Sequence, residues 1–488
     1  MDIVEIGSKL LASRASNPLF AVGERLLYND AVREPVVRFI DQRLRANVDR
    51  NEHLPVGQRE IARQRKLMGL ALFHAVAKAL RQSTISPQVA HGLLNVFLRT
   101  LMLGSGKQPA YERFKDKFGC NPPWFVTVSP GKACNLNCVG CYANSGPSPA
   151  KLPWPIFDRI IEEAKELWGC RFIVISGGEP LAYRSDGKGV LDAVEKHSDC
   201  MFLMYTNGTL IDKEMAARMA RAGTLTPAIS VEGLRERTDE RRGAGVFDRI
   251  LEAMANLREA GVPFGISITA TRFNCEEILS DEFLDFFFGE QGALYAFIFH
   301  YMPIGRRYTL DLMPTPGQRI ELWRRTWEVI EKRQIVLIDF WNEGPLVQGC
   351  ISAGREGGYI YIDWNGKVMP CVFAPYSVAN IHDVYANGGT LNDLWEAPFF
   401  QAIRQWQYDY GYGREEPLRE GNWLRTCPIR DHYRMYRELI ERYGPEPEDE
   451  AAQEALEDEE YYKGLVAYGV DFGEFSQEIW EKEYLGQG

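Results

Sequence analysis

The sequence lacks the features that would place it outside the cell or across a membrane. Its first residues show no charged segment followed by an apolar one, so we expect no secretory signal. No stretch reaches about 18 uninterrupted apolar residues, the length that a membrane-spanning helix needs. The chain also has no internal repeat or long low-complexity tract, and its 10 cysteines are ordinary usage for 488 residues. We therefore expect a cytoplasmic chain with reduced cysteines and two to three domain cores.

Three of these cysteines lie within eight residues. Cys134, Cys138 and Cys141 occur in the run KACNLNCVGCY, which is a CxxxCxxC-Tyr loop. Three thiolates on one short loop can hold three corners of a [4Fe–4S] cluster and leave the fourth iron without a protein ligand. A structural zinc site is the alternative, but such sites usually combine two CxxC pairs. No second pair lies within about 30 residues of this loop.

Strand and helix patterns alternate around and after the cysteine loop. The expected strands are 124–129, 171–176, 201–206, 226–231, 264–270 and 295–301. The main helices are expected at 151–168, 212–222 and 247–260. Such alternation predicts parallel β/α units with right-handed crossovers, and six strands suit a partial (β/α)6 barrel. Ligands bind at the C-terminal ends of strands in such sheets.

The polar and glycine-rich residues of the barrel region follow directly after these strands. The candidate ligand-binding residues are Ser176, Gly177, Gly178, Glu179, Thr206, Asn207, Ser230, Glu232 and Arg242. Gly177 and Gly178 allow positive φ and close approach of the backbone to a ligand, and the Glu179 carboxylate can accept a hydrogen bond from an ammonium group. Each motif taken alone also fits a plain turn, and Arg242 fits a solvated loop charge.

Taken together, the cysteine loop, the Ser-Gly-Gly-Glu-Pro motif and the Ser-Val-Glu-Gly motif resemble the radical S-adenosylmethionine (SAM) enzymes over roughly residues 122–310. The resemblance implies that the three cysteines bind a [4Fe–4S] cluster whose open iron chelates SAM. It further implies cleavage of SAM to a 5′-deoxyadenosyl radical that abstracts hydrogen from an unactivated C–H bond. Residues 176–180 would then contact the amino group of SAM, while Ser230 and Arg242 would help to hold its ribose and carboxylate.

A second cysteine set follows the barrel region. Cys350, Gly366 and Cys371 have the spacing Cys-x15-Gly-x4-Cys, and Cys427 is the only later cysteine. The Asn-Gly dipeptide at 365–366 lies between two strand patterns and predicts a β-hairpin, which would bring the first two cysteines together. The spacing resembles the SPASM/twitch domain over roughly residues 345–435. This resemblance implies an auxiliary [4Fe–4S] cluster bound by the three cysteines.

The second set departs from that family because it has no fourth cysteine. The cluster could keep an open site, take a non-cysteine ligand such as Asp431 or His432, or recruit one of the scattered cysteines. Those are Cys120, Cys170, Cys200 and Cys275, which are most simply small core residues. A zinc ion held by the three cysteines and His432 is a further alternative.

The two ends of the chain carry opposite charge. Residues 1–118 contain 19 Lys and Arg against 11 Asp and Glu, whereas residues 444–488 contain 14 acidic residues against 2 Lys. Apolar helices are expected in the basic front at 68–80 and 93–103. Basic charge beside such helices suits peripheral contact with anionic lipid on the inner face of a membrane, or a helical cap on the barrel. We expect no nucleic-acid binding, because no aromatic and basic residues interleave.

These features predict an α/β fold. The expected parts are a basic helical region at 1–118, a radical SAM partial barrel at 119–310, a twitch-like α+β domain at 345–435 and an acidic tail at 444–488. The tail should be partly helical at 450–465 and either dock on the basic front or be solvated.

The predicted function is a radical SAM enzyme that uses a reductant such as flavodoxin or ferredoxin. We expect a small-molecule or lipid substrate, with coupling of acyl chains as in bacterial radical SAM proteins that join lipid tails, which the chain resembles. Maturation of a ribosomally made peptide is an alternative, although its enzymes usually carry a winged-helix recognition module that a helical front does not supply. A non-catalytic iron–sulfur electron carrier or a zinc-stabilised binding protein is the alternative from another class.

Overall fold

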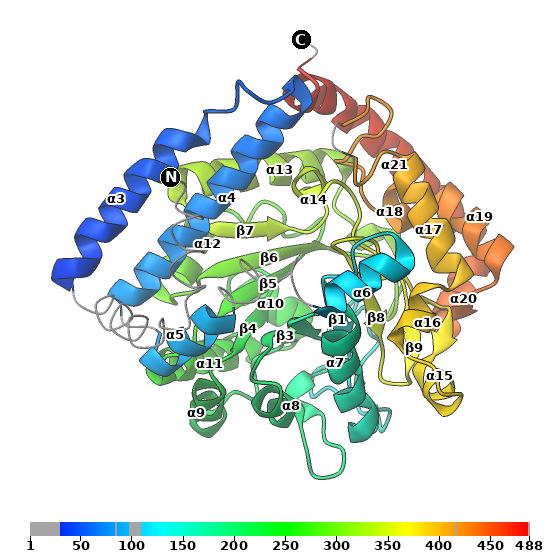
Figure 1. Cartoon of the computed structure of the whole chain (residues 1–488), viewed down its shortest axis with the longest axis horizontal. Coiled ribbons are helices and arrows are strands. Elements are labelled where there is room, and N and C mark those ends of the chain that lie inside the picture. Colours follow the sequence, from blue (N-terminus) through cyan, green and yellow to red (C-terminus); the bar gives the residue numbers. More distant parts are fainter. Residues whose placement is uncertain (1–29, 83–84, 97–108, 415–416, 487–488) are drawn as a thin grey trace.

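The computed structural model describes residues 30–82, 85–96, 109–414 and 417–486. At its centre lies a ten-stranded sheet of order β11-β9-β8-β1-β2-β3-β4-β5-β6-β7 (Figure 1). From β1 to β7 the strands are parallel, and each one pairs with the next in sequence. These seven strands are β1 (Phe125–Val128), β2 (Phe172–Ile175), β3 (Met201–Thr206), β4 (Leu225–Val231), β5 (Gly265–Ala270), β6 (Tyr295–His300) and β7 (Val336–Asp339).

The six predicted strands are confirmed, but the barrel contains a seventh parallel strand. The long helix α13 (Pro316–Arg333) leads into β7, which pairs with β6. The segment Val-Leu-Ile-Asp is as apolar and β-branched as the six strands that were predicted. The predicted partial (β/α)6 barrel is therefore confirmed, and α13 and β7 extend its sheet by one further β/α unit.

The predicted hairpin is confirmed and joins the barrel sheet. Strands β8 (Tyr359–Ile362) and β9 (Lys367–Met369) pair antiparallel around Gly366, whose φ is 81°. Strand β8 also pairs parallel with β1, so the second cysteine set is attached to the first edge of the barrel. The remaining short strands are β10 (Tyr376–Ser377), β11 (Ala379–Asn380) and β12 (Glu446–Pro447).

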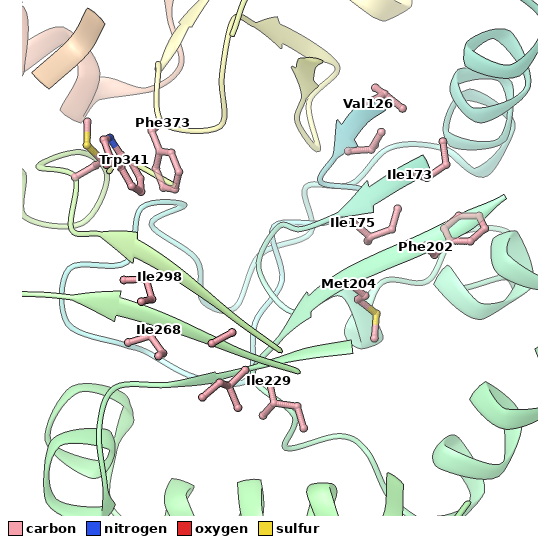
Figure 2. Close-up of a cluster of buried hydrophobic side chains, with 14 of the residues drawn as sticks. Val126, Ile173, Ile175, Phe202, Met204, Ile229, Ile268, Ile298, Trp341 and Phe373 are labelled. Carbon is pink, nitrogen blue, oxygen red and sulfur yellow. The ribbon is translucent and has the colours of Figure 1, made fainter. Parts of the chain in front are cut away.

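Alternate residues of the parallel strands pack against the surrounding helices. Figure 2 shows Val126, Ile173, Phe202 and Ile229 along neighbouring strands, and all four are fully buried. The helices of this layer are α7 (Trp154–Trp168), α8 (Val190–Lys196), α9 (Lys213–Ala222), α10 (Arg235–Arg242), α11 (Val246–Ala260) and α12 (Asp281–Leu284), with the π-helical turn η3 (Asp285–Glu290). The 3₁₀ turns are η2 (Pro180–Ala182) and η4 (Leu310–Leu312). The strand residues between the buried ones are left to line the inner face of the sheet.

The described part of the first 118 residues is helical and contains no strand. Its helices are α3 (Asp30–Val48), α4 (Val56–Arg81), α5 (Pro87–Val96) and α6 (Pro109–Phe118). Helix α4 contains the predicted segment 68–80 and packs on α3, α13, α14 and β7, as a cap would. The predicted segment 93–103 lies within α5 only as far as Val96, and residues 97–103 are outside the described part. No helix in the described ranges is long and apolar enough to span a bilayer.

The acidic C-terminal segment is helical and docked. It forms α20 (Glu450–Glu457), α21 (Glu459–Ile479) and the π-helical turn η5 (Trp480–Tyr484). Helix α21 packs on α13, α18 and α19, and η5 packs on α4, where Gln64 Nε2 donates to the Tyr484 hydroxyl at 2.9 Å. Of the two predicted alternatives, docking on the N-terminal helices is confirmed. Buried aromatic side chains such as Trp480 make this contact, so charge attraction alone does not explain it.

Short helices complete the region between the barrel and this segment. They are α14 (Gly344–Val347), α15 (Ile381–Ala386), α16 (Leu391–Trp395), α17 (Pro398–Asp409), α18 (Pro428–Asp431) and α19 (Tyr433–Tyr443). In Figure 1, α15 to α19 lie with β8 and β9 on one side of the barrel, whereas α14 lies near α4; α18 and α19 pack on α21.

Candidate functional site

The first cysteine loop follows β1 at the C-terminal end of the sheet. Cys134, Cys138 and Cys141 are free and partly buried. Arg306 Nη1 donates to the Cys138 carbonyl at 2.8 Å, and Arg241 Nε donates to the Val139 carbonyl at 3.1 Å. Burial raises the pKa of the Cys134 thiol to about 11. The thiolate form therefore depends on metal binding, which displaces the proton. The guanidinium groups of Arg306 and Arg241 lie beside this loop, where the thiolates would place negative charge.

The Ser-Gly-Gly-Glu-Pro motif packs directly on the backbone of that loop. Gly178 N donates to the Gly131 carbonyl at 3.0 Å, and Glu179 N donates to the Ala133 carbonyl at 2.8 Å. A Cβ atom on Gly178 would lie only 2.3 Å from the Lys132 carbonyl oxygen. The close approach of the two backbones thus requires a glycine at position 178, as predicted. The segment that Gly178 approaches is the cysteine loop and not a ligand.

Glu179 ties the ends of β2 and β3 together. Its carboxylate is fully buried and accepts hydrogen bonds from the Thr206 hydroxyl at 2.7 Å, the Asn207 backbone N–H at 2.8 Å and the Leu181 backbone N–H at 3.1 Å. The Asn207 side chain continues to Asn135 Oδ1 at 2.9 Å, within the cysteine loop. Both Glu179 oxygens therefore help to fix the loop, and Oε2, which accepts one hydrogen bond here, can still accept a second one from an ammonium group.

The end of β4 carries a buried carboxylate with one free oxygen. Glu232 Oε1 accepts hydrogen bonds from Arg242 Nε at 2.9 Å and from Arg241, whereas Oε2 is buried and has no hydrogen-bond partner. The Arg242 side chain is 10% exposed, so the alternative of a solvated loop charge is wrong. Ser230 is partly buried two residues before Glu232. A buried acceptor without a partner marks a place where a bound ligand can donate.

Aromatic side chains line the inner face of the barrel near both cysteine sets. Tyr205 on β3 and Phe299 on β6 are partly buried, with ring centroids 5.3 Å apart. Phe373 lies two residues after Cys371 of the second set. Its ring centroid is 5.8 Å from that of Phe299 and 5.7 Å from that of Tyr142, the residue after Cys141. Figure 2 shows Phe373 beside Trp341. This aromatic lining therefore reaches from one cysteine loop to the other.

The second cysteine set lies where β8 and β9 meet α18. Cys371 Sγ is 3.0 Å from the Tyr359 hydroxyl, and Cys350 Sγ is 3.1 Å from the Ser352 hydroxyl. Burial raises the pKa of Cys371 to about 12 and that of Cys427 to about 11, and the Cys350 charge adds to both shifts. The three predicted thiols are thus near enough to influence one another electrostatically. Over the described ranges, no three His, Cys, Asp or Glu side chains are grouped as ligands of a single metal ion.

Neither non-cysteine ligand suggested by the sequence is free. Asp431 is fully buried and forms a bidentate pair with Arg319, at 2.6 and 3.0 Å, while Arg430 Nε donates to it at 3.2 Å. His432 Nε2 donates to the Arg425 carbonyl at 3.0 Å, and burial lowers the His432 pKa to about 4. Asp431 therefore has buried charged partners and also accepts from the Cys427 backbone N–H at 3.1 Å, whereas His432 uses its Nε2 for the Arg425 carbonyl.

Comparison with known proteins assigns the family. The model of the Radical SAM superfamily matches residues 128–279, and the model of SPASM, an iron–sulfur cluster-binding domain, matches residues 350–418. The mycofactocin maturase MftC of Mycobacterium tuberculosis is 32% identical over 305 residues, which cover 59% of this chain and 74% of that protein. The chain belongs to the radical SAM superfamily and carries a SPASM domain.

Other radical SAM proteins are similar over much of the chain. The AdoMet-dependent heme synthase of Methanosarcina barkeri is 28% identical over 314 residues, which cover 58% of this chain and 85% of the synthase. Streptococcus suis SuiB, solved with its precursor peptide SuiA, shares the fold with a TM-score of 0.51 at 19% identity, over 70% of this chain and 79% of that one. This radical SAM protein is thus an enzyme that uses SAM, a [4Fe–4S] cluster and an auxiliary iron–sulfur cluster.

The donor sets of the radical SAM protein fit these cofactors. Two groups of three thiols suit iron–sulfur clusters, and the free Glu232 oxygen suits a polar ligand at the end of β4. A cavity of about 470 Å³ lies beside the first cysteine loop, between the loop that carries Arg306 and Arg307 and the α20 residue Glu454. It offers an approach from solvent to the region around Asn144, three residues after Cys141.

Two carboxyl groups at the barrel rim, one fully buried and one partly buried, were missed by the sequence analysis. Asp363 follows β8, is fully buried and has one oxygen, Oδ2, without a hydrogen-bond partner. Glu448 follows β12 directly. Lys367 Nζ donates a hydrogen bond to the carbonyl of the preceding residue, Pro447, at 2.9 Å. Burial, then the charges of Asp363 and Asp449, raise the Glu448 pKa to about 8, against the opposing effect of Lys132 and Lys367. Glu448 belongs to the acidic tail, and no local pattern distinguishes it from solvated neighbours.

The pKa of Glu448 predicts a pH-dependent stability. Its native pKa of about 8 exceeds the ordinary 4.5, so the unfolded chain releases this proton first and stability falls as pH rises toward 8. Between pH 6.5 and 8, we expect the free energy of unfolding of the wild type to fall by about 2 kcal/mol more than that of Glu448→Gln. Urea unfolding across this range measures the difference, and Glu450→Gln, at an exposed position two residues away, should behave like the wild type. Parallel pH curves for wild type and Glu448→Gln would contradict the prediction.

Proposed function

We propose that Cys134, Cys138 and Cys141 hold the SAM-binding [4Fe–4S] cluster and that Cys350, Cys371 and Cys427 hold the auxiliary cluster. SAM and its cluster, when bound, supply the one-electron chemistry that abstracts hydrogen from an unactivated C–H bond. The substrate would bind on the aromatic lining between the two cysteine sets. The protein's own contribution is to place, shield and hold these groups.

The predicted SAM residues divide into two roles. Gly177 and Gly178 let the β2 loop lie against the cysteine loop, and Glu179, Thr206 and Asn207 fix that loop by the hydrogen bonds described above. The residues Ser176, Ser230, Glu232 and Arg242 supply the polar groups for SAM. The Arg242 guanidinium would face the SAM carboxylate, and the unpartnered Glu232 oxygen would accept a hydrogen bond from a hydroxyl or ammonium group.

The aromatic lining carries the proposal for the substrate class. Tyr205, Phe299 and Phe373 form a surface that favours an aromatic or otherwise apolar group, through area burial and edge-to-face contacts. MftC is named a maturase, and SuiB was solved with a precursor peptide. We therefore propose that the substrate is a peptide that inserts an aromatic side chain here. The cavity beside Arg307 and Glu454, which these three rings do not line, would hold another part of the peptide.

The lipid substrate expected from the sequence has weaker support. The described N-terminal helices expose Val36, Phe39, Leu72 and Val76, which suits an apolar contact surface, but none of the relatives named above is described as acting on lipid. The helices also provide no strand for a winged-helix peptide-recognition module, so a peptide would have to be recognised elsewhere, as at the cavity. Lipid acyl chains remain one arm of the test.

The test is a substrate screen on anaerobically reconstituted enzyme with dithionite and SAM. Peptides that contain Tyr or Trp should stimulate 5′-deoxyadenosine formation above the substrate-free rate, whereas matched Ala peptides and vesicles of anionic lipid should not. Phe299→Leu should raise KM for an active peptide about 10-fold, since it removes ring contacts of about 1 kcal/mol or more, and should spare substrate-free SAM cleavage. Phe202→Leu, which faces the helices, is the matched control. Stimulation by lipid alone would contradict the proposal.

A further inference from the structure

Two buried hydrogen-bond donors near the second cysteine set lack a partner within the described ranges. They are the Arg430 guanidinium on α18, through Nη1 and Nη2, and the Tyr436 hydroxyl on α19. Arg430 is fully buried and Tyr436 is 1% exposed, so water does not solvate either group. A buried polar group that lacks a partner costs about 1–3 kcal/mol, and more when it is charged. Such groups therefore indicate that a further component binds beside them.

The Arg430 guanidinium lies near Cys427. Arg430 belongs to the short helix α18, three residues after Cys427. Burial and the Asp431 charge raise the pKa of the Cys427 thiol, and the Arg430 charge opposes this rise. The guanidinium carbon is 5.3 Å from the centre of the Trp341 ring, whose centroid is 5.0 Å from that of Phe373. Arg430 is therefore placed beside the second cysteine set.

The carboxylate that accepts a hydrogen bond from Arg430 is shared with a second guanidinium group. Arg430 Nε donates to Asp431 Oδ1 at 3.2 Å, while Arg319 donates to both oxygens of Asp431 at 2.6 and 3.0 Å. One carboxylate thus serves two cations, so the Arg430 charge is only partly offset. A buried charge requires a close partner of opposite sign, and Nη1 and Nη2 can still donate hydrogen bonds. An anionic group beside them would meet both needs.

The Tyr436 hydroxyl is the second donor. Burial raises the pKa of Tyr436 well above its ordinary value, so the hydroxyl keeps its proton. The charges of Tyr376, Cys371 and Cys427 add to this rise, so Tyr436 is near enough to both thiols to be influenced by them. Its ring centroid is 5.8 Å from that of Phe399 and 6.3 Å from that of Tyr376, and these contacts hold the ring in place. The hydroxyl can therefore donate a hydrogen bond close to the second cysteine set.

We propose that Arg430 and Tyr436 donate hydrogen bonds to the auxiliary cluster and thereby raise its reduction potential. This inference rests on the proposed function in one respect, namely that Cys350, Cys371 and Cys427 hold that cluster. A cluster with thiolate ligands becomes more negative when it takes up an electron. Positive charge and hydrogen bonds to its sulfur atoms stabilise the reduced form and so change the potential. The two side chains would therefore favour electron uptake by the auxiliary cluster.

A redox titration of the auxiliary cluster tests this role. A variant with Cys134, Cys138 and Cys141 all changed to Ala keeps only this cluster, and the electron paramagnetic resonance signal of the reduced form follows the titration. In this background, Arg430→Met should lower the ratio of reduced to oxidised cluster about 10-fold at a fixed potential, which corresponds to a reduction potential about 59 mV lower. Tyr436→Phe should lower the ratio about 3-fold, because a neutral donor forms a weaker hydrogen bond than a charged one.

Two further variants make the titration specific. Arg430→Lys keeps the positive charge and should retain part of the potential that Arg430→Met loses. Tyr385→Phe removes another buried hydroxyl, whose charged neighbours are Glu163 and Arg159, and should leave the potential unchanged. Iron content should stay at about four atoms in each variant of this background.

The other results separate this inference from the proposed function. A loaded cluster whose potential is unchanged in both Arg430→Met and Tyr436→Phe would overturn the role of these two residues alone. A folded triple variant that binds no iron would overturn the auxiliary site itself. If Arg430→Met does not fold, Tyr436→Phe still tests the inference, because it removes a single oxygen atom. If the triple variant does not fold, the same titration on wild type, compared with Cys371→Ala, gives the auxiliary signal by difference.

Discussion

Cys138→Ala should abolish 5′-deoxyadenosine formation from SAM while about four of about eight iron atoms remain bound. The loss should be at least 1000-fold, on the order of 4 kcal/mol or more in transition-state stabilisation, because two thiolates cannot hold the SAM-binding cluster. The second cysteine set lies on other elements, near β8, β9 and the start of α18, so it should keep its iron. Anaerobic reconstitution, iron and sulfide analysis and chromatography of the nucleoside product measure both quantities.

Two controls make this result specific. Cys170→Ala removes a buried thiol that donates to the Phe172 carbonyl, and it should change neither iron content nor SAM cleavage. Cys371→Ala should lower iron by about four atoms while substrate-free SAM cleavage persists. A Cys138→Ala protein that still cleaves SAM would show that this thiol is not a ligand. A non-catalytic iron–sulfur carrier would show no cleavage even in the wild type.

The parts of the fold that depend on local pattern were predicted well. The limits of β3 (Met201–Thr206) agree with the prediction, because a run of apolar residues between turn signals fixes them. The Asn-Gly hairpin between β8 and β9 is likewise local. The pairing of Phe125 with Tyr359 joins residues far apart in sequence, and no periodicity in either strand encodes it. Sequence therefore predicted a twitch-like region but not that its hairpin continues the barrel sheet.

The same division applies to the site. Spacing singled out the cysteines as candidate ligands, because three ligands on one loop must be close in sequence. The groups that hold the loop come from elsewhere: Arg306 follows β6, and Asn207 follows β3. The raised pKa of Glu448 arises from burial against Asp363 and Asp449, and burial of a tail residue depends on where the tail docks. Spacing therefore predicts ligands, whereas the surrounding groups that tune them need the tertiary structure.

Asp431→Leu should lower the free energy of unfolding by about 3–5 kcal/mol, because it leaves buried positive charge without a partner. Arg319 and Asp431 are both fully buried, and the Arg319 guanidinium also lies 3.5 Å from the centre of the Phe472 ring on α21. Asp431 thus joins the barrel helix α13, the auxiliary-site helix α18 and the C-terminal helix α21. The neighbouring Arg430 has two buried nitrogens without hydrogen-bond partners, which makes it depend on the same carboxylate.

The expected loss has a pH signature and a compensating variant. The guanidinium groups hold the Asp431 pKa below its usual range, so its contribution is present above about pH 4 and disappears as pH falls. Arg319→Met combined with Asp431→Leu should recover part of the stability, since one unpaired charge is removed with its partner. Arg324→Met breaks an exposed pair with Glu321 and should cost under about 1 kcal/mol. Urea unfolding at pH 7 measures the free energy of unfolding of all three variants. If Asp431→Leu lowers it by less than about 1 kcal/mol, water reaches Arg319. Helix α21 would then not exclude water from the contact between α13 and α18.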